Sequence, residues 1–298
     1  MSRHVLDIDD FTADELASVL ELSERTTWPH PLDGKGVALI FEKPSARTRN
    51  ATEMAVVQLG GYPLTMRGDE VGFDVRESVE DIARTMSCYH AAIAARVFRH
   101  EVVERLARAS SVPVVNLLSD RSHPMQALAD LLTMRQEFGR LDGRMLAYVG
   151  DANNVCRSLL LGATMLGMKT RVASPAGYGL GAADVDRLRM FGSEPALTTS
   201  PIEAVGGADV VYTDVWVSMG QEDERETRLR QFEGFGVDDA LMTHAANNAI
   251  FLHCLPAKRG YEVSDDVVDG PQSRVWQQAA NRMHTARGVL LWLFGSAQ

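Results

Sequence analysis

The chain has 298 residues, of which 45% are hydrophobic and 23% charged, a balance typical of globular proteins rather than disordered ones. Its formal net charge of −10 disfavours nonspecific nucleic-acid binding, which needs a positive surface, so we expect no nucleic-acid partner. No apolar run approaches the ~20 residues of a membrane span, and the N-terminus lacks the apolar core of a signal peptide. We therefore expect a cytoplasmic protein that makes no membrane contact.

Three cysteines are present, Cys88, Cys156 and Cys254, and three thiols cannot all pair. No C-x-x-C pair occurs. Free, reduced thiols are the expected state.

Apolar runs of strand length alternate with segments of helical period, which predicts an α/β fold with mainly parallel sheets flanked by helices. In the first half of the chain, strands are predicted at Gly36–Phe41, Ala91–Arg96 and Val112–Asn116, and helices at Ala46–Leu59 and Pro124–Phe138. In the second half, strands are predicted at Met145–Val149, Lys169–Ala173, Asp209–Tyr212 and Ala249–Leu252, and helices at Val155–Leu166 and Ser273–Phe294.

The glycine-containing segment from Phe138 to Arg144 separates the two α/β series. We therefore predict a first domain over residues 1–138, a second over 139–272, and a C-terminal helix over 273–298.

The segment Phe41–Arg49 follows a predicted strand and opens a helix. Ser45 can cap this helix, and Arg47 and Arg49 add positive charge at its N-terminus, where free N–H groups favour an anion. A capped helix with solvent-facing arginines would explain the segment equally well. The glycines at 177, 179 and 181 do not open a helix after a strand, so they indicate a loop rather than a dinucleotide site.

A polar loop, Ser119–Gln126, lies between a strand and a helix, the place where open α/β sheets usually bind ligands. His123 and Gln126 are suited to bonding a small carbonyl or amide group, although a histidine at this place, taken by itself, is more often an exposed neighbour of the helix cap. Arg96 closes an apolar strand and is either a ligand-binding cation or a surface ion-pair partner.

Two further segments follow short strands in the second half. Asp214 could hold a substrate cation, and Ser218 with the Met219 N–H a second polar group. Cys254 ends the last apolar strand, where a free cysteine is most often a small buried hydrophobe. His253 should point to the opposite strand face, and the pair lacks zinc-site spacing, so neither a Cys–His dyad nor a metal site is predicted.

These segments, in this order, resemble motifs of the aspartate/ornithine carbamoyltransferase family. Ser45-Ala-Arg47-Thr48-Arg49 is similar to its S-T-R-T-R motif and His123-Pro-Met-Gln126 to H-P-x-Q, while Asp214 with Ser218-Met219-Gly220, and His253-Cys254-Leu255-Pro256, resemble motifs of the ornithine branch. The resemblance extends from Ile8 to Arg282.

The resemblance implies transfer of the carbamoyl group of carbamoyl phosphate to the δ-amine of L-ornithine, giving L-citrulline and phosphate for arginine biosynthesis. It implies no cofactor and no metal, a homotrimer, and a C-terminal helix that returns to the first, carbamoyl-phosphate-binding domain. The second domain would bind ornithine.

The implied site residues fall into three groups. Carbamoyl phosphate would be held by Ser45, Arg47, Thr48, Arg96, His123, Gln126, Arg282 and the Leu255 carbonyl. Ornithine would be held by Asn154, Asp214, Ser218 and Met219. The catalytic residues would be Arg96, His123, Asp214 and Cys254, with Cys254 beside the reacting amine.

Two residues depart from the family pattern. Ala46 replaces the usual threonine of the first motif, and Glu70 stands near the place where some relatives have a glutamine that reaches a neighbouring subunit's phosphate. The alternatives are a carbamoyltransferase for another amine, such as putrescine or an acylated ornithine, or a catalytically silent anion-binding member.

Overall fold

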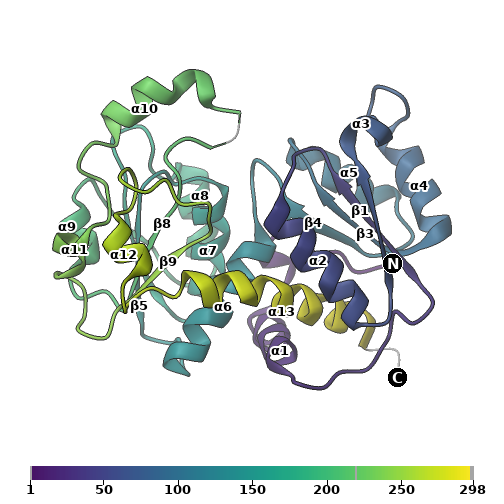
Figure 1. Cartoon of the computed structure of the whole chain (residues 1–298), viewed down its shortest axis with the longest axis horizontal. Coiled ribbons are helices and arrows are strands. Elements are labelled where there is room, and N and C mark those ends of the chain that lie inside the picture. The colour runs from purple at the N-terminus through teal and green to yellow at the C-terminus, as the bar shows by residue number, and fades with distance from the viewer. Residues whose placement is uncertain (1, 219, 296–298) are drawn as a thin grey trace. The chain divides into compact units, whose positions relative to one another are not determined.

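The computed structural model describes residues 2–218 and 220–295, and the chain divides into two compact units (Figure 1). Unit 1 comprises Met1–Leu132 with Ala280–Gln298, and unit 2 comprises Thr133–Ala279. The division falls inside helices α6 (Pro124–Phe138) and α13 (Val275–Phe294) rather than in the loop that follows Phe138. The domain limits drawn from the sequence remain a prediction.

Unit 1 contains a parallel sheet of four strands in the order β2-β1-β3-β4. Its strands are β1 (Gly36–Phe41), β2 (Tyr62–Arg67), β3 (His90–Arg96) and β4 (Val114–Leu118). The central strands β1 and β3 are buried along almost their whole length, which explains their continuous apolar runs. In the register of the sheet, Phe41 pairs with Arg96, so β1 and β3 end together.

The remaining elements of unit 1 are helical. They are η1 (Ile8–Asp10), α1 (Ala13–Glu24), α2 (Ala46–Gln58), α3 (Gly68–Val71), α4 (Val79–Tyr89) and α5 (His100–Ala109). Because α2 starts only a few residues after β1 ends, its N-terminus lies at the carboxyl edge of the sheet.

The C-terminal part of α13 belongs to unit 1 and is bound there by polar contacts to α1 and α2. Arg287 is buried, donates to the Gln58 side-chain oxygen at 2.8 Å and to the Ser23 carbonyl at 3.0 Å, and stacks over the ring of Trp28. The predicted return of the C-terminal helix to the first half of the chain is confirmed.

Unit 2 contains a parallel sheet of five strands in the order β7-β6-β5-β8-β9. Its strands are β5 (Met145–Val149), β6 (Lys169–Ala173), β7 (Ala196–Thr198), β8 (Val210–Thr213) and β9 (Ile250–His253). Its other elements are α7 (Asn154–Met165), α8 (Ala182–Arg189), α9 (Pro201–Val205), η2 (Glu222–Glu224), α10 (Arg225–Gln231), α11 (Asp239–Met242) and α12 (Asp265–Asp269). The chain runs outward from β5 to β7 and then returns to β8, so the strand order reverses between β5 and β8, where open sheets bind ligands.

The predicted α/β fold with two parallel sheets is confirmed, and β1, β5, β6 and α6 have the predicted bounds. Strand β2 was not predicted, because it is a half-exposed edge strand that contains Pro63, and proline weakens a strand pattern. Among the described residues, no helix is both long enough and apolar enough to cross a membrane.

The close packing of α13 on α1 gives a stability prediction for Gly288. A Cβ at this position would lie 2.0 Å from the Ser23 Oγ and 2.8 Å from the Val19 carbonyl oxygen. Gly288→Ala should therefore destabilise the protein by about 1–3 kcal/mol, the usual cost of overpacking. Urea unfolding measures the change. The control is Gly295→Ala, where a Cβ meets no atom within 4 Å, and equal stability of the two variants would contradict the packing argument.

Candidate active site

The first cluster of site residues lies in unit 1, at the start of α2. Ser45 is the N-cap, and its hydroxyl accepts the Thr48 N–H at 3.3 Å. Thr48 is buried, whereas Ala46 and Arg47 of the same turn are exposed. The first turn of α2 thus combines a buried hydroxyl with the positive end of the helix dipole.

Two arginines converge on the Thr48 hydroxyl. Arg96, the last residue of β3, donates to the Thr48 Oγ1 at 3.4 Å, and Arg282 of α13 donates to the same atom at 2.7 Å. Their residues are only 6% and 7% exposed, which is rare for guanidinium groups. Two buried cations at a helix N-terminus form a site for an anion such as a phosphate.

His123 lies beside these cations and is 4% exposed. Burial, with the charges of Arg282 and Arg96, lowers the pKa of His123 well below its ordinary value of 6.5. The imidazole is therefore neutral at physiological pH, and it can bond an uncharged carbonyl or amide group without adding a third positive charge. Gln126, one turn further along α6, is fully buried.

Glu70 is placed in the short helix α3, where its carboxylate accepts the Arg67 N–H at 2.9 Å. Arg67 also forms an exposed ion pair with Asp69. Glu70 is thus bonded to the backbone of its own loop.

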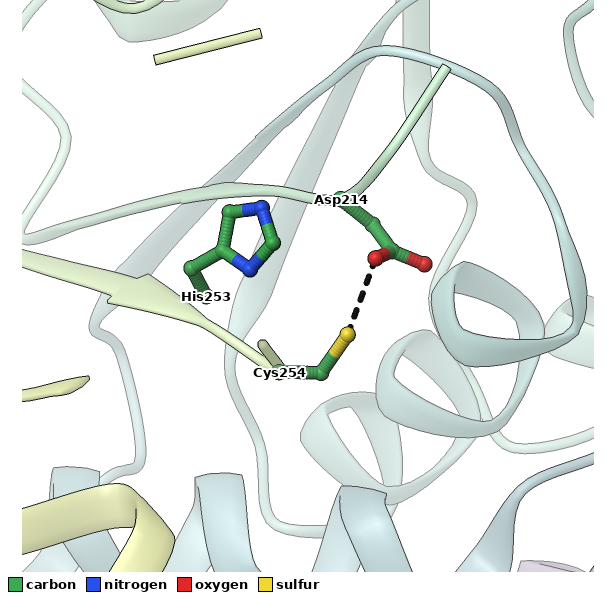
Figure 2. A group of neighbouring side chains, drawn as sticks. All are labelled: Asp214, His253 and Cys254. Atoms are coloured by element: carbon green, nitrogen blue, oxygen red, sulfur yellow. Dashed lines mark hydrogen bonds between the residues drawn. The ribbon is translucent and has the colours of Figure 1, made fainter. Parts of the chain in front are cut away.

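The second cluster lies in unit 2, at the carboxyl ends of β8 and β9. Asp214 follows β8 directly and is 5% exposed. Its Oδ2 accepts from the Asn153 side chain at 2.8 Å, and its Oδ1 accepts from the Val215 N–H at 2.8 Å and the Cys254 thiol at 2.9 Å (Figure 2). Three donors therefore hold one buried carboxylate in a single orientation.

The sequence prediction placed His253 on the opposite face from Cys254, and the structure brings their side chains together. β9 ends at His253, so strand alternation does not extend to Cys254. One ligand atom each from Asp214, His253 and Cys254 lies within 4.8 Å of the others (Figure 2). Such a set could hold a soft divalent cation, although structural zinc sites have four protein ligands. The spacing argument missed this cluster because Asp214 comes from another strand.

His253 also has a structural role that the sequence analysis did not assign. Its Nδ1 accepts the Leu255 N–H at 2.9 Å, so the proton of the neutral ring lies on Nε2, which faces Glu262 at 3.3 Å. Leu255 has a left-handed backbone with φ of 59°. The buried His253–Glu262 pair thus holds the backbone that carries the predicted Leu255 carbonyl contact.

Three further residues were predicted to bind ornithine, namely Asn154, Ser218 and Met219. Asn154 is the first residue of α7, and Ser218 is half-buried with its N–H bonded to the Gln221 side chain at 3.0 Å. Met219 lies outside the described residues. The sequence analysis did not identify Asn153, whose side chain donates to the Asp214 carboxylate, although an asparagine before a helix is a strong cap signal.

Both halves of the chain match models of known protein domains. Residues 3–136 match the family model of the aspartate/ornithine carbamoyltransferase carbamoyl-P binding domain, and residues 142–293 match that of the Asp/Orn binding domain. The chain belongs to the aspartate/ornithine carbamoyltransferase family.

Individual relatives within this family are similar over nearly their full length. The ornithine carbamoyltransferase of Acidothermus cellulolyticus is 49% identical over 308 residues, covering 100% of this chain and 98% of the relative. That of Thermus thermophilus is 48% identical over 297 residues, covering 98% and 97%. The solved structure of the Pyrococcus furiosus ornithine carbamoyltransferase has a TM-score of 0.94 at 43% identity, covering 100% of this chain and 98% of that one.

The lowered pKa of His123 predicts how stability depends on pH. Because this pKa lies below the unfolded-state value, the folded protein resists protonation, and stability is lost as pH falls below about 6.5. Replacing His123 by Gln should reduce this loss by up to about 1.4 kcal/mol per pH unit. Urea unfolding at pH 7, 6 and 5 measures it.

His30→Gln is the control for this experiment, because His30 is an exposed histidine of the same unit. An identical pH slope for the wild type and His123→Gln would show that His123 is not held neutral.

Proposed function

We propose that this protein transfers the carbamoyl group of carbamoyl phosphate to the δ-amine of L-ornithine, producing L-citrulline and phosphate. The observation that carries the proposal is the convergence of buried Arg96 and Arg282 on Thr48 beside a neutral His123. The chain's similarity to ornithine carbamoyltransferases supports the choice of substrates. We propose that the reaction serves arginine biosynthesis in the cytoplasm.

The unit 1 cluster suits both parts of carbamoyl phosphate. The phosphate would interact with Ser45, Arg47 and Thr48 at the start of α2, and with Arg96. His123, Gln126 and Arg282 would hold the carbamoyl group, with the Leu255 carbonyl as a further acceptor. The hydroxyl lost at Ala46 leaves the buried Thr48 hydroxyl and the first-turn N–H groups as phosphate donors on α2.

The unit 2 cluster suits an amino acid with a second amine. Asp214 would accept the α-ammonium of ornithine, because its carboxylate is already oriented by three donors. Asn154, Ser218 and Met219 would bond the remaining polar groups, and Cys254 would lie beside the δ-amine.

In the reaction, the lone pair of the neutral δ-amine forms a C–N bond to the carbamoyl carbon. Negative charge develops on the carbamoyl oxygen, where Arg96, His123 and Thr48 would stabilise it. The bond between this carbon and the phosphate oxygen then breaks, phosphate leaves with the electron pair, and the amine loses its extra proton. Phosphate is a good leaving group, so orientation and electrostatics would supply most of the acceleration.

Self-association is also part of the proposal. Four exposed apolar side chains lie on two elements that contact each other, Met54 and Val57 on α2 and Tyr62 and Leu64 on the edge strand β2. An exposed apolar edge of this kind favours burial against another chain. We propose that three copies associate, as the family resemblance implies, with the Arg67–Arg76 loop directed to a neighbouring copy.

The acceptor is tested by initial rates with ornithine, putrescine and N-acetylornithine. A site built to bond the α-ammonium and carboxylate leaves polar atoms unpaired when putrescine binds, so ornithine should be preferred by at least ~100-fold in kcat/KM. Activity should rise from pH 6 to about 8.5, because the attacking amine must lose its proton. Equal or better turnover of either rival would overturn the ornithine assignment.

Asp214→Asn should lower kcat/KM for ornithine severely and reduce the preference over putrescine. The control is Asp223→Asn, which replaces an exposed aspartate of the same unit in the same way. A variant at Asp214 with the wild-type preference would remove this residue from the amine site.

Light scattering tests the assembly. The wild type should have three times the 32.7 kDa chain mass, and the double variant Tyr62→Glu, Leu64→Glu should dissociate because it places two charges on the apolar edge. Tyr89→Glu, at a more exposed tyrosine on α4, should remain assembled. A wild-type monomer that keeps full activity at high dilution would contradict the proposal.

A further inference from the structure

We infer that Asp130 is a positioning residue that fixes the orientation of the Gln126 amide and thereby makes the site select a carbamoyl amino group over a methyl group. This inference rests on the proposed function, because it concerns the same carbamoyl-phosphate site. It assigns a role to a residue that is outside the motifs from which the site was predicted.

Asp130 and Gln126 lie one helical turn apart on α6, within unit 1. Both side chains are fully buried. The Gln126 Nε2 donates to the Asp130 Oδ1 at 2.7 Å, within the usual range for an N–H···O hydrogen bond.

This hydrogen bond determines which end of the amide is available to a ligand. The NH2 group of Gln126 faces Asp130 and donates to its carboxylate oxygen. This is the orientation that an ionised Asp130 requires, because an ionised carboxylate can only accept. The opposite orientation would place the amide oxygen against a carboxylate oxygen. The Gln126 Oε1 is therefore turned away from Asp130, and it is buried without a hydrogen-bond partner among the described residues.

The position of Gln126 places this acceptor in the unit 1 cluster. Gln126 follows His123 by three residues, and its N–H donates to the His123 carbonyl at 3.1 Å, so the two side chains share one side of the helix start. His123 in turn interacts electrostatically with Arg282 and Arg96. A buried acceptor beside an anion site is suited to a ligand that carries a hydrogen-bond donor next to its phosphate.

Carbamoyl phosphate and acetyl phosphate differ in the group that this acceptor would meet. Both have a carbonyl bonded to a phosphate oxygen, but carbamoyl phosphate carries NH2 where acetyl phosphate carries CH3. The NH2 group donates to the Gln126 Oε1, whereas the methyl group would leave that oxygen buried and unsatisfied. Without Asp130 the Gln126 amide could flip, and the preference for carbamoyl phosphate over acetyl phosphate would weaken.

The test is the ratio of the affinities for the two acyl phosphates in the wild type and in Asp130→Asn. Asparagine has nearly the same shape, but its amide can donate as well as accept, so it permits both orientations of Gln126. The dissociation constant of carbamoyl phosphate, from calorimetry, should rise about tenfold, consistent with loss of one hydrogen bond to a buried group. The inhibition constant of acetyl phosphate should stay within about twofold, since its methyl group forms no such bond.

Gln126→Met provides the matched second variant, because it removes the amide while keeping the length of the side chain. Gln126→Met alone should abolish the preference for carbamoyl phosphate over acetyl phosphate. Adding Asp130→Asn to it should leave the ratio of the two affinities unchanged, since the two residues act through one interaction. The Michaelis constant for ornithine should not change in parallel with the ratio of the two acyl-phosphate affinities.

Three outcomes would overturn the inference. An Asp130→Asn variant that binds both acyl phosphates more weakly to the same extent would show a structural role only. An unchanged ratio would show that Asp130 does not orient Gln126. Additive effects in the double variant would show that the two residues act separately.

If Asp130→Asn does not fold, the wild type supplies the decisive measurement. The Gln126 side-chain NH2, assigned by the loss of its NMR signal in Gln126→Met, should show no scalar coupling through a hydrogen bond to 13C-labelled carbamoyl phosphate, because this group faces Asp130. A coupling from the NH2 to the ligand would show that the NH2 faces the ligand and would overturn the inference. A wild type that binds neither acyl phosphate would instead overturn the proposed function, and the orientation inference with it.

Discussion

Two buried guanidinium groups share one threonine hydroxyl in unit 1, and the proposed chemistry of that unit depends on this contact. Arg96 comes from a sheet strand, Arg282 from the C-terminal helix, and Thr48 from the first turn of α2. Removing two cations from water is costly unless opposite charge compensates it, and a bound phosphate would supply that charge together with the helix dipole. Burial, together with the same charges, lowers the pKa of His123, so the adjacent imidazole stays neutral.

Unit 2 buries an acidic side chain where unit 1 buries basic ones. Its buried group is an acid, Asp214, and its partners are a cap side chain, a backbone N–H and a thiol. These donors carry no positive charge, so the carboxylate keeps its full attraction for an ammonium group while its orientation is held. The two units thus present one site for an anion and one for a cation, in accord with a phosphate ester and an amino acid as the proposed substrates.

Both clusters lie where parallel strands end, and neighbouring side chains set the finer orientation. The Asp130 carboxylate turns the amide of Gln126, as the His253 ring holds the N–H of Leu255. Both of these supporting side chains are buried. In each case a side chain that would not itself contact the proposed substrate would decide which atom of its neighbour faces that substrate.

The sequence by itself determined the α/β class, most central strands and the residues of the four motifs, because burial on both faces of a parallel sheet demands long apolar runs and the loops after them carry polar side chains. It did not reveal the edge strand β2, whose half-exposed pattern has no clear period. Only the tertiary structure showed that Thr48 and Arg282, 234 residues apart, meet, and that Asn153 and Cys254 both donate to Asp214. The Asp214 contacts follow from strand order, which brings distant segments to one edge of a sheet, and the Thr48–Arg282 contact follows from the packing of the C-terminal helix in unit 1. No local pattern in the chain encodes either.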